Sequence, residues 1–182
     1  MKKINVIGTS GSGKSTFSRQ LSEALGIPYI EMDAIFWEKD WNMPKDKVFF
    51  QKLKMALKQE KWVLDGNYSR TNDLKWKEVD TIIWIDFSFA RTFYQAIRRA
   101  INRVITKKEL WPGTGNRESF KQLLSKDSIV WWTLKTYKRN RVKYLKVMDN
   151  PNYKHIEFIH LKTPKACKEF LYKIKQEYGE NS

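Results

Sequence analysis

The apolar positions of the chain fall into two kinds of segment that alternate along it. Short runs in which apolar residues are almost continuous predict strands at 3–7, 28–32, 61–65, 80–86 and 155–161. Runs without polar alternation are typical of parallel strands that are covered on both faces. The pattern therefore indicates a parallel sheet between layers of helices.

Between these runs, apolar residues recur every three or four positions, which is the spacing of an amphipathic helix. The spacing predicts helices near 14–25, 45–60, 88–105, 117–125, 128–148 and 164–177. Because β and α segments alternate, we expect an α/β fold, a doubly wound sheet with right-handed crossovers. Ligands of such folds bind beyond the carboxyl ends of the strands. The residues that follow each strand are therefore the first candidates for a site.

The first strand leads into the loop GTSGSGKST at residues 8–16, which matches the phosphate-binding pattern G-x-x-x-x-G-K-[ST]. Lys14 would supply charge to the β- and γ-phosphates, and the Ser15 hydroxyl suits Mg²⁺. The loop also opens a helix, whose N-terminus favours an anion. The alternative is a glycine-serine turn without a ligand, and the order of strand, loop and helix favours the phosphate. The predicted nucleotide-binding residues of this loop are Gly8, Ser10, Gly11, Ser12, Gly13, Lys14, Ser15 and Thr16.

Two carboxylates follow the second predicted strand. Glu31 and Asp33 are two residues apart, so in an extended chain they project to the same side. Asp33 can bind a substrate hydroxyl, act as a base or hold Mg²⁺ through water, and the alternative is a helix N-cap or turn. Trp37 and Trp41 come next, and they either form the wall of an acceptor pocket or pack in the core or a lid.

The third predicted strand ends in WVLDGNYSR. Apolar residues followed by Asp65 form a Walker-B-like strand end, which places a carboxylate near a metal. Gly66 would let a substrate approach the backbone, and Arg70 could clamp a phosphate or carboxylate, with Asn67 in the same segment. The alternative is a plain β-turn. Asp86 ends the fourth strand, and the sequence leaves open which aspartate serves the metal.

Two absences bear on the reaction. Neither Asp65 nor Asp86 is followed by the glutamate with which hydrolytic P-loop ATPases activate water, and the sequence has no Asn-Lys-x-Asp motif for guanine recognition. Both absences favour phosphoryl transfer to a bound acceptor over hydrolysis.

Composition narrows the class of protein. The 182 residues are 41% apolar and include a single cysteine, Cys167, so we expect one domain without an internal disulfide, in a reducing cytoplasm. We expect neither a signal peptide nor a membrane span, because no long apolar run is present. The net charge is +15, and residues 91–146 hold 15 lysines and arginines against three acidic residues. This charge indicates either a solvated basic face or attraction of nucleotide phosphates or nucleic acid.

Four arginines in this basic stretch are candidates for phosphate contacts. Arg99 and Arg103 are four residues apart and share one helix face, and Arg117 follows a loop at 111–116. Arg141 falls within an apolar stripe and therefore needs either an anion or a structural carboxylate. The stripe consists of Val130, Leu134, Tyr137, Leu145 and Met148.

The segments GTSGSGKST, EMD and WVLDGNYSR, with the RxxxR of Arg99 and Arg103, resemble adenylate-kinase-like P-loop kinases. More narrowly, IEMDAIFW, WVLDGNYSR and LWPGTGNRES resemble the bacterial group called topology modulation protein, or FlaR-like. The resemblance implies a three-layer fold with a five-stranded sheet in the order 2-3-1-4-5. It also implies one P-loop kinase-like domain over 1–182, with an acceptor-binding segment at about 33–60 and a helical lid at about 104–128.

The resemblance further implies ATP and Mg²⁺, with Ser15 and Asp65 at the metal. It places Arg99 and Lys162 near the adenine. Arg103, Arg117 and Arg141 would contact the transferring phosphates. Glu31-Met32-Asp33 stands where adenylate kinases have Thr-Gly-Asp, which is closer to small-metabolite kinases such as shikimate kinase.

We therefore expect a cytoplasmic kinase that transfers the γ-phosphoryl group of ATP to a small acceptor. The expected catalytic residues are Lys14, Asp33, Arg103, Arg117 and Arg141, and the expected substrate-binding residues are Asp33, Trp37, Asp65, Gly66, Asn67 and Arg70. The alternatives are a nucleotide-switched DNA-binding regulator that affects DNA topology and a nucleotide-binding scaffold without activity. The basic residues fall where a kinase lid needs arginines, so nucleic acid is the less favoured partner. The oligomeric state stays open.

Overall fold

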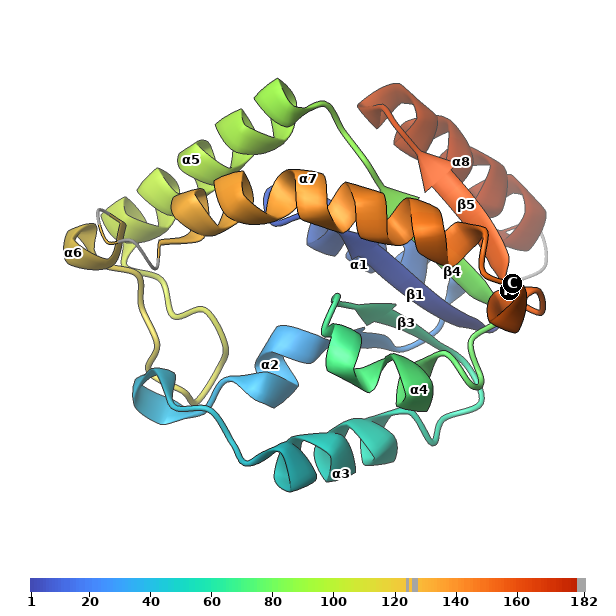
Figure 1. Ribbon diagram of the computed structural model, residues 1–182, viewed down its shortest axis with the longest axis horizontal. Coiled ribbons are helices and arrows are strands. Elements are labelled where there is room, and N and C mark those ends of the chain that lie inside the picture. The colour runs from blue at the N-terminus through green and yellow to red at the C-terminus, as the bar shows by residue number, and fades with distance from the viewer. Residues whose placement is uncertain (124, 126–127, 180–182) are drawn as a thin grey trace.

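Five parallel strands form one sheet in the computed structural model, which describes residues 1–123, 125 and 128–179 (Figure 1). The strands are β1 (Lys3–Gly8), β2 (Tyr29–Glu31), β3 (Trp62–Asp65), β4 (Thr81–Ile85) and β5 (Glu157–Leu161). Their order across the sheet is β2-β3-β1-β4-β5, with β1 at the centre. The predicted α/β fold class and strand order are confirmed, and each strand lies within about two residues of its predicted bounds.

Helices cover both faces of this sheet. They are α1 (Lys14–Leu25), α2 (Met32–Phe36), α3 (Asp46–Ala56), α4 (Asn72–Lys75), α5 (Phe89–Thr106), α6 (Phe120–Leu123), α7 (Ile129–Met148) and α8 (Pro164–Gly179). Helices α1 and α8 pack on one face, and α2, α3 and α7 pack on the other. Figure 1 shows α7 crossing the molecule near α5, and the two helices are in contact.

Alternate residues of the central strand supply the two cores. Ile4 and Val6 pack towards α1 and α8, whereas Ile7 packs on the opposite face. Asn5, between Ile4 and Val6 in β1, is fully buried. Its side-chain amide donates to the carbonyl of Leu64 in the neighbouring strand β3. Its own side-chain oxygen accepts a hydrogen bond of 2.8 Å from Trp76 Nε1. A polar side chain at the centre of the sheet is therefore fully paired, as its burial requires.

The helices differ from the sequence predictions in several respects. The helix predicted at 45–60 ends at Ala56, and the helix predicted at 117–125 is present as Phe120–Leu123, while residue 124 of that prediction lies outside the described residues. The apolar spacing does not predict α2 or α4, because helices of five and four residues are too short to show a period. The predicted apolar stripe of α7 is only partly correct: Tyr137 is buried and Met148 packs against the core, whereas Leu134 and Leu145 are exposed. The buried face of α7 instead uses Thr133, whose hydroxyl donates to the Ile129 carbonyl. A threonine hydroxyl that donates to a carbonyl of its own helix can be buried on the packed face of that helix. Because threonine is polar, the hydropathy pattern does not predict such a buried position.

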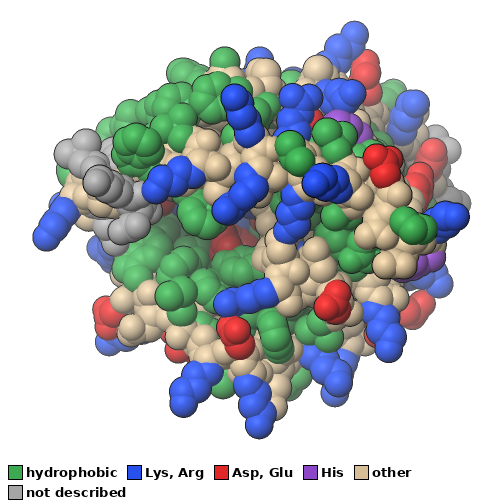
Figure 2. Space-filling view, viewed as in Figure 1, with side chains coloured by type: hydrophobic (Ala, Val, Ile, Leu, Met, Phe, Trp, Pro, Cys, Tyr) green, Lys and Arg blue, Asp and Glu red, His purple; other side chains and the backbone are tan. Residues whose placement is uncertain are grey.

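The basic residues of the 91–146 stretch fall into two groups in the tertiary structure, most of them exposed and two of them in a pocket. Figure 2 shows lysine and arginine side chains distributed over the visible face and interspersed with hydrophobic side chains. Arg99 and Arg103 instead line a pocket of the molecule. In the part of the chain that the structure describes, none of the helices combines the length and apolar character needed to cross a membrane.

Candidate functional site

The phosphate loop lies at the carboxyl edge of the sheet, between β1 and α1. Gly11 adopts a φ of 86°, and a Cβ at this position would lie 2.5 Å from the carbonyl oxygen of Thr92 in α5. Glycine is therefore required both for its backbone conformation and for close packing. The buried Ser12 Oγ has no hydrogen-bond partner among the described residues. A loop that holds a buried hydroxyl in this state is suited to a bound phosphate.

Lys14 faces Asp65 across the start of this loop. Strands β1 and β3 are neighbours with Val6 in register with Asp65, so the carboxylate lies next to the loop. The Lys14 Nζ atom is 3.6 Å from Asp65 Oδ1, and both side chains are largely buried. The other Asp65 oxygen accepts a hydrogen bond of 3.1 Å from the Tyr29 hydroxyl. Burial, with the charge of Asp65 as a further cause, raises the pKa of Tyr29, so this hydroxyl keeps its proton.

Two arginines of α5 reach the same region. Arg99 donates from its terminal nitrogen to Ser10 Oγ at 2.8 Å, and its Nε has no partner among the described residues. Arg103 forms an ion pair of 2.9 Å with Glu118. Burial lowers the pKa of Arg99, and the neighbouring charge of Arg103 acts in the same direction. Arg99 thus contacts the phosphate loop itself, and both arginines offer donors to an anion bound there.

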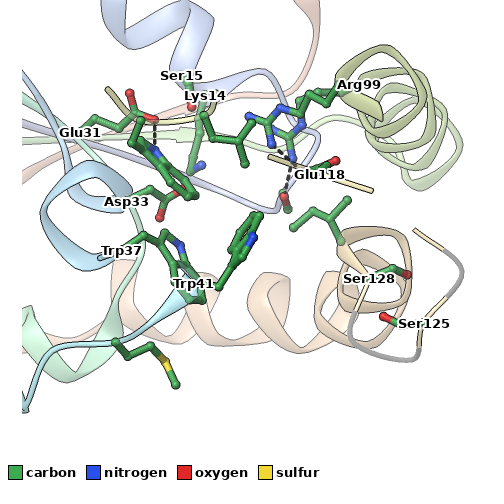
Figure 3. Close-up of a pocket in the computed structure, with 16 residues that line it drawn as sticks. Lys14, Ser15, Glu31, Asp33, Trp37, Trp41, Arg99, Glu118, Ser125 and Ser128 are labelled. Carbon is green, nitrogen blue, oxygen red and sulfur yellow. Dashed lines mark hydrogen bonds and ion pairs between the residues drawn. The ribbon is translucent and has the colours of Figure 1, made fainter. Parts of the chain in front are cut away.

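One pocket of about 590 Å³ extends from the phosphate loop to a cluster of tryptophans (Figure 3). Lys14, Ser15 and Arg99 line it together with Asp33 and Trp37, and Figure 3 shows Arg99 across the cavity from Asp33 and Trp37. This volume is typical of sites for small molecules. The loop and the segment after β2 are therefore parts of one site.

The two carboxylates after β2 have different surroundings. The chain turns into α2 at Met32, so the predicted extended geometry of Glu31 and Asp33 is wrong, although both line the pocket. Glu31 accepts hydrogen bonds from Arg19 at 3.0 Å and from Trp111 Nε1 at 3.2 Å. Each of its oxygens is thus engaged by another side chain.

Asp33 has one hydrogen-bond donor among the described contacts, the hydroxyl of Tyr68. Its Oδ1 accepts a hydrogen bond of 2.7 Å from the Tyr68 hydroxyl. Burial and the charge of Asp33 raise the pKa of Tyr68, so Tyr68 stays a donor and orients the carboxylate. Asp33 is the carboxylate best placed to contact a ligand hydroxyl.

The segment after β3 supports the loop rather than the acceptor side. The space that a Cβ of Gly66 would need is taken by Met32, at 2.7 Å. The Asn67 amide donates to the carbonyl of Gly8 and accepts from its N–H, at 2.6 and 3.0 Å. Arg70 pairs with Asp46 at 2.9 Å and does not line the pocket. Gly66, Asn67 and Arg70, which were predicted to bind substrate, therefore lie outside the described pocket lining, and their binding role stays a prediction.

Three further predicted residues also lie outside the described pocket lining. Arg141 donates from Nε to Asp86 at 3.0 Å, so of its two alternatives the structural carboxylate is present. His160 Nε2 lies 2.9 Å from the same Asp86 oxygen. Asp86 is thus engaged by these side chains, and Asp65 is the aspartate beside Lys14. Arg117 and Lys162 are exposed and absent from the lining.

Sequence patterns do not reveal several residues that shape the site. Trp111 packs nearly parallel to Trp37, with ring centroids 6.1 Å apart. Asn116 is buried, accepts from the Trp41 N–H at 2.8 Å and donates to the Glu38 carbonyl at 2.9 Å. Both residues follow α5 and contact the segment after β2, so only the fold connects them to the site. The segment LWPGTGNRES that contains them is the one available signal.

Lys75 is fully buried beneath the loop after β3. Its Nζ donates to the carbonyl oxygens of Asn67 at 3.0 Å and Gly66 at 3.4 Å. Burial lowers the pKa of Lys75 from 10.5 to about 7, and the charge of Lys143 acts in the same direction. The buried Lys75 amine thus holds the segment that supports the phosphate loop.

We expect Lys75 to make the free energy of unfolding depend on pH. The unfolded chain keeps the ordinary pKa, so between about pH 7 and 10 it binds more protons than the native state. Stability should therefore rise through this window, by at most about 1.4 kcal/mol per pH unit, and Lys75 should add no slope well below pH 7. Urea unfolding of the wild type and Lys75→Met from pH 6.5 to 9.5 should show a steeper rise in the wild type. Parallel curves would contradict the assignment.

The fold and the phosphate loop define the class: this chain has the fold of the P-loop kinases. A model of the shikimate kinase family matches residues 10–66, which run from the phosphate loop to the residue after β3. Shikimate kinase from Acinetobacter baumannii, in complex with shikimate, superposes with a TM-score of 0.56 at 15% identity, covering 100% of this chain and 95% of that one. At this identity the likeness concerns the fold.

Three curated relatives are similar in sequence. Shikimate kinase from Persephonella marina is 26% identical over 142 residues, which cover 69% of this chain and 81% of the relative. Cytidylate kinases from two strains of Nitratidesulfovibrio vulgaris are 37% identical over 46 residues, covering 25% of this chain. The match spans 20% of the length of those cytidylate kinases.

Proposed function

We propose that this protein is an ATP-dependent P-loop kinase that transfers the γ-phosphoryl group to a hydroxyl of a small acceptor. One observation carries the proposal: Lys14 of the phosphate loop and Asp33 line the same pocket. A cationic phosphate site that faces a carboxylate across one cavity suits phosphoryl transfer, because the donor and the acceptor hydroxyl are held together. The similarity to shikimate and cytidylate kinases supports the same reaction class.

The position of each residue in the pocket indicates its role in the proposed reaction. Lys14 and Arg99 lie at the loop and would stabilise negative charge on the transferring group. Asp33, oriented by Tyr68, would orient the acceptor hydroxyl and accept its proton. Arg103 would join the phosphates once Glu118 releases it. Arg117 and Arg141 would need a rearrangement to take part, because they lie outside the described lining.

The residues present fit a magnesium ion. The buried Asp65 Oδ1 has no hydrogen-bond partner among the described residues, and Ser15 lies at the start of α1 beside the loop. Mg²⁺ prefers few protein oxygens together with phosphate and water, which matches this pair. Ser15 and Asp65 would hold the ion, which would neutralise charge on the β- and γ-phosphate oxygens.

The acceptor segment and the lid would together exclude water. We infer one kinase domain over residues 1–182, with the acceptor segment at about 33–60 and the lid at about 104–128. Asn116 and Trp111 connect these two segments, because Asn116 accepts from the Trp41 N–H and Trp111 packs against Trp37. Exclusion of water would favour transfer over hydrolysis of ATP. We place the enzyme in the cytoplasm, where ATP is available, and assign it to the topology modulation (FlaR-like) group of these kinases.

A DNA-binding regulator is the second candidate, and the exposed basic residues favour it. Among them are Arg98 and Arg139, which lie on the outer faces of α5 and α7. A protein that binds DNA through such residues would lose affinity steeply as salt rises. Binding of labelled duplex DNA between 50 and 200 mM salt distinguishes the two functions. A kinase that does not bind DNA should show little affinity at the upper concentration.

The Asp33→Asn variant tests the kinase proposal directly. We expect acceptor-dependent formation of ADP to fall by about 10²-fold or more, because the variant cannot accept a proton. Asp40→Asn is the matched control, since Asp40 is an exposed carboxylate of the same segment and asparagine tolerates its φ of 57°. Equal rates for Asp33→Asn and the wild type would refute the role of Asp33.

A further inference from the structure

The pocket is lined by charged side chains of both signs. The basic side chains of the described lining are Lys14, which belongs to the phosphate loop, Arg99, which contacts that loop, and Arg103. The carboxylates are Glu118, which pairs with Arg103, and Glu31 and Asp33 at and after the end of β2. Figure 3 shows Arg99 on one side of the cavity and Asp33 with Trp37 on the other. The part of the pocket lined by Glu31, Asp33 and Trp37 is called the acceptor end here, and it carries two of the three carboxylates.

The arginines near the acceptor end are turned to other partners. Arg70, which the sequence suggested as a clamp, pairs with Asp46 and lies over the rings of Phe36 and Phe49 at 5.2 and 5.4 Å. Arg19 is half-exposed and pairs with Glu31. The cations of the described lining, Lys14, Arg99 and Arg103, would be engaged by the phosphates of ATP. An anionic acceptor group would therefore have to compete for them or meet Asp33 at the cost of like-charge repulsion.

Three tryptophans form a corner at the acceptor end. Trp37 and Trp111 are nearly parallel at 18°, and Trp41 stands almost perpendicular to them, at 76° and 83°. Trp37 and Trp41 are partly exposed and line the cavity, whereas Trp62 and Trp76 are fully buried in the core. The corner is thus a wall of the pocket in addition to a packing cluster. Indole faces bind flat apolar rings well.

We propose that the acceptor is an uncharged hydroxylated compound with an aromatic ring, that is, a nucleoside. Its base packs against Trp41 and its sugar hydroxyl binds Asp33. The inference rests on the proposed kinase function and narrows its substrate class. The acceptor oxygen forms a bond to the γ-phosphorus while the bond from that phosphorus to the β–γ bridging oxygen breaks, which releases ADP. The hydroxyl proton passes to the Asp33 carboxylate and then to solvent.

The test compares acceptors that differ in charge and ring type. Adenosine, guanosine, cytidine and uridine are offered beside their 5′-monophosphates and shikimate, which is an anion without an aromatic ring. With Mg·ATP, kcat/KM for the best nucleoside should exceed that of its monophosphate and of shikimate by at least about tenfold. Preference for a monophosphate or for shikimate would overturn the inference and leave the kinase function standing.

Variants of Trp41 give the second readout. Trp41→Ala should raise the KM for the nucleoside by roughly tenfold or more, as loss of an aromatic stacking partner predicts. The KM for ATP should stay the same, and Trp41→Phe should restore much of the affinity. Trp132→Ala is the control, because Trp132 is about half-exposed on α7 and absent from the described pocket lining. An unchanged nucleoside KM in Trp41→Ala would count against the inference.

Calorimetric titration separates the inference from the kinase function. The nucleosides and shikimate are titrated into the protein with Mg²⁺ and a non-hydrolysable ATP analogue. Nucleoside binding in this titration, combined with no ADP formation in the acceptor comparison with Mg·ATP, would support the ligand class and refute the kinase function. Absence of nucleoside binding would refute the inference, whatever the activity with other acceptors.

Discussion

Lys14→Met should lower acceptor-dependent formation of ADP by about 10²- to 10³-fold, the usual effect of removing one preorganised charge at a transferring group. Methionine keeps the aliphatic stem that fills the space beside the phosphate loop, so the loss reports the charge. The measurement is the initial rate of ADP release with Mg·ATP and the best acceptor. A rate within twofold of the wild type would contradict the role of Lys14 in phosphoryl transfer.

The same substitution has a structural consequence that needs its own control. Asp65 is 3% exposed, and Lys14→Met leaves this carboxylate without its partner at 3.6 Å. An unpaired buried charge is destabilising, so the melting temperature should fall. The double variant Lys14→Met with Asp65→Asn should recover stability without recovering activity. Lys58→Ala, at an exposed position of the loop before β3, should change neither quantity.

Gly66→Ala should destabilise the protein by about 2–4 kcal/mol in urea unfolding. Gly66 has a φ of 149°, and an added Cβ would lie 2.7 Å from the Cβ of Met32, which is fully buried. A contact with the first atom of a side chain cannot be relieved by rotating the end of that side chain. The loop that carries Asn67 and contacts Gly8 would therefore have to shift.

Gly26→Ala separates backbone strain from this close contact. Gly26 also has a positive φ, of 62°, but a Cβ there would meet nothing within 4 Å. We expect a loss of about 1 kcal/mol, which is the cost of the left-handed conformation alone. Equal losses for the two variants would show that the contact with Met32 is relieved at little cost. A larger loss for Gly66→Ala supports the packing explanation.

Local chemistry explains the accuracy of the strand predictions. Strands β3 and β4 are apolar runs without alternation, because both faces of the sheet are covered, and such runs are visible in the sequence. The phosphate loop is equally local, since its glycines, Lys14 and Ser15 lie within eight residues. The short helices α2 and α4 show no period, and the buried threonines of α7 show no apolar stripe.

Side-chain partners are the part of the site that could not be predicted. The apolar stripe around Arg141 indicated a buried partner, but two alternatives fitted, and only the fold brought Asp86 within 3.0 Å. Arg70 has the right position after β3 for a substrate clamp, yet Asp46 and two phenylalanine rings hold it outside the pocket. Rotamers and partners from distant segments determine these contacts, and residue spacing carries no information about them.

The sequence by itself determined the α/β alternation, the phosphate loop and the carboxylates that follow β2 and β3, because each depends on residues close together in the chain. The tertiary structure alone decided that Asp65 rather than Asp86 accompanies Lys14, and that Trp111 and Asn116 complete the acceptor end. Trp111 is 80 residues from Glu31, and Asn116 is 75 residues from Trp41. Contacts over such separations arise from the order of strands and the packing of helices, and no local pattern encodes them.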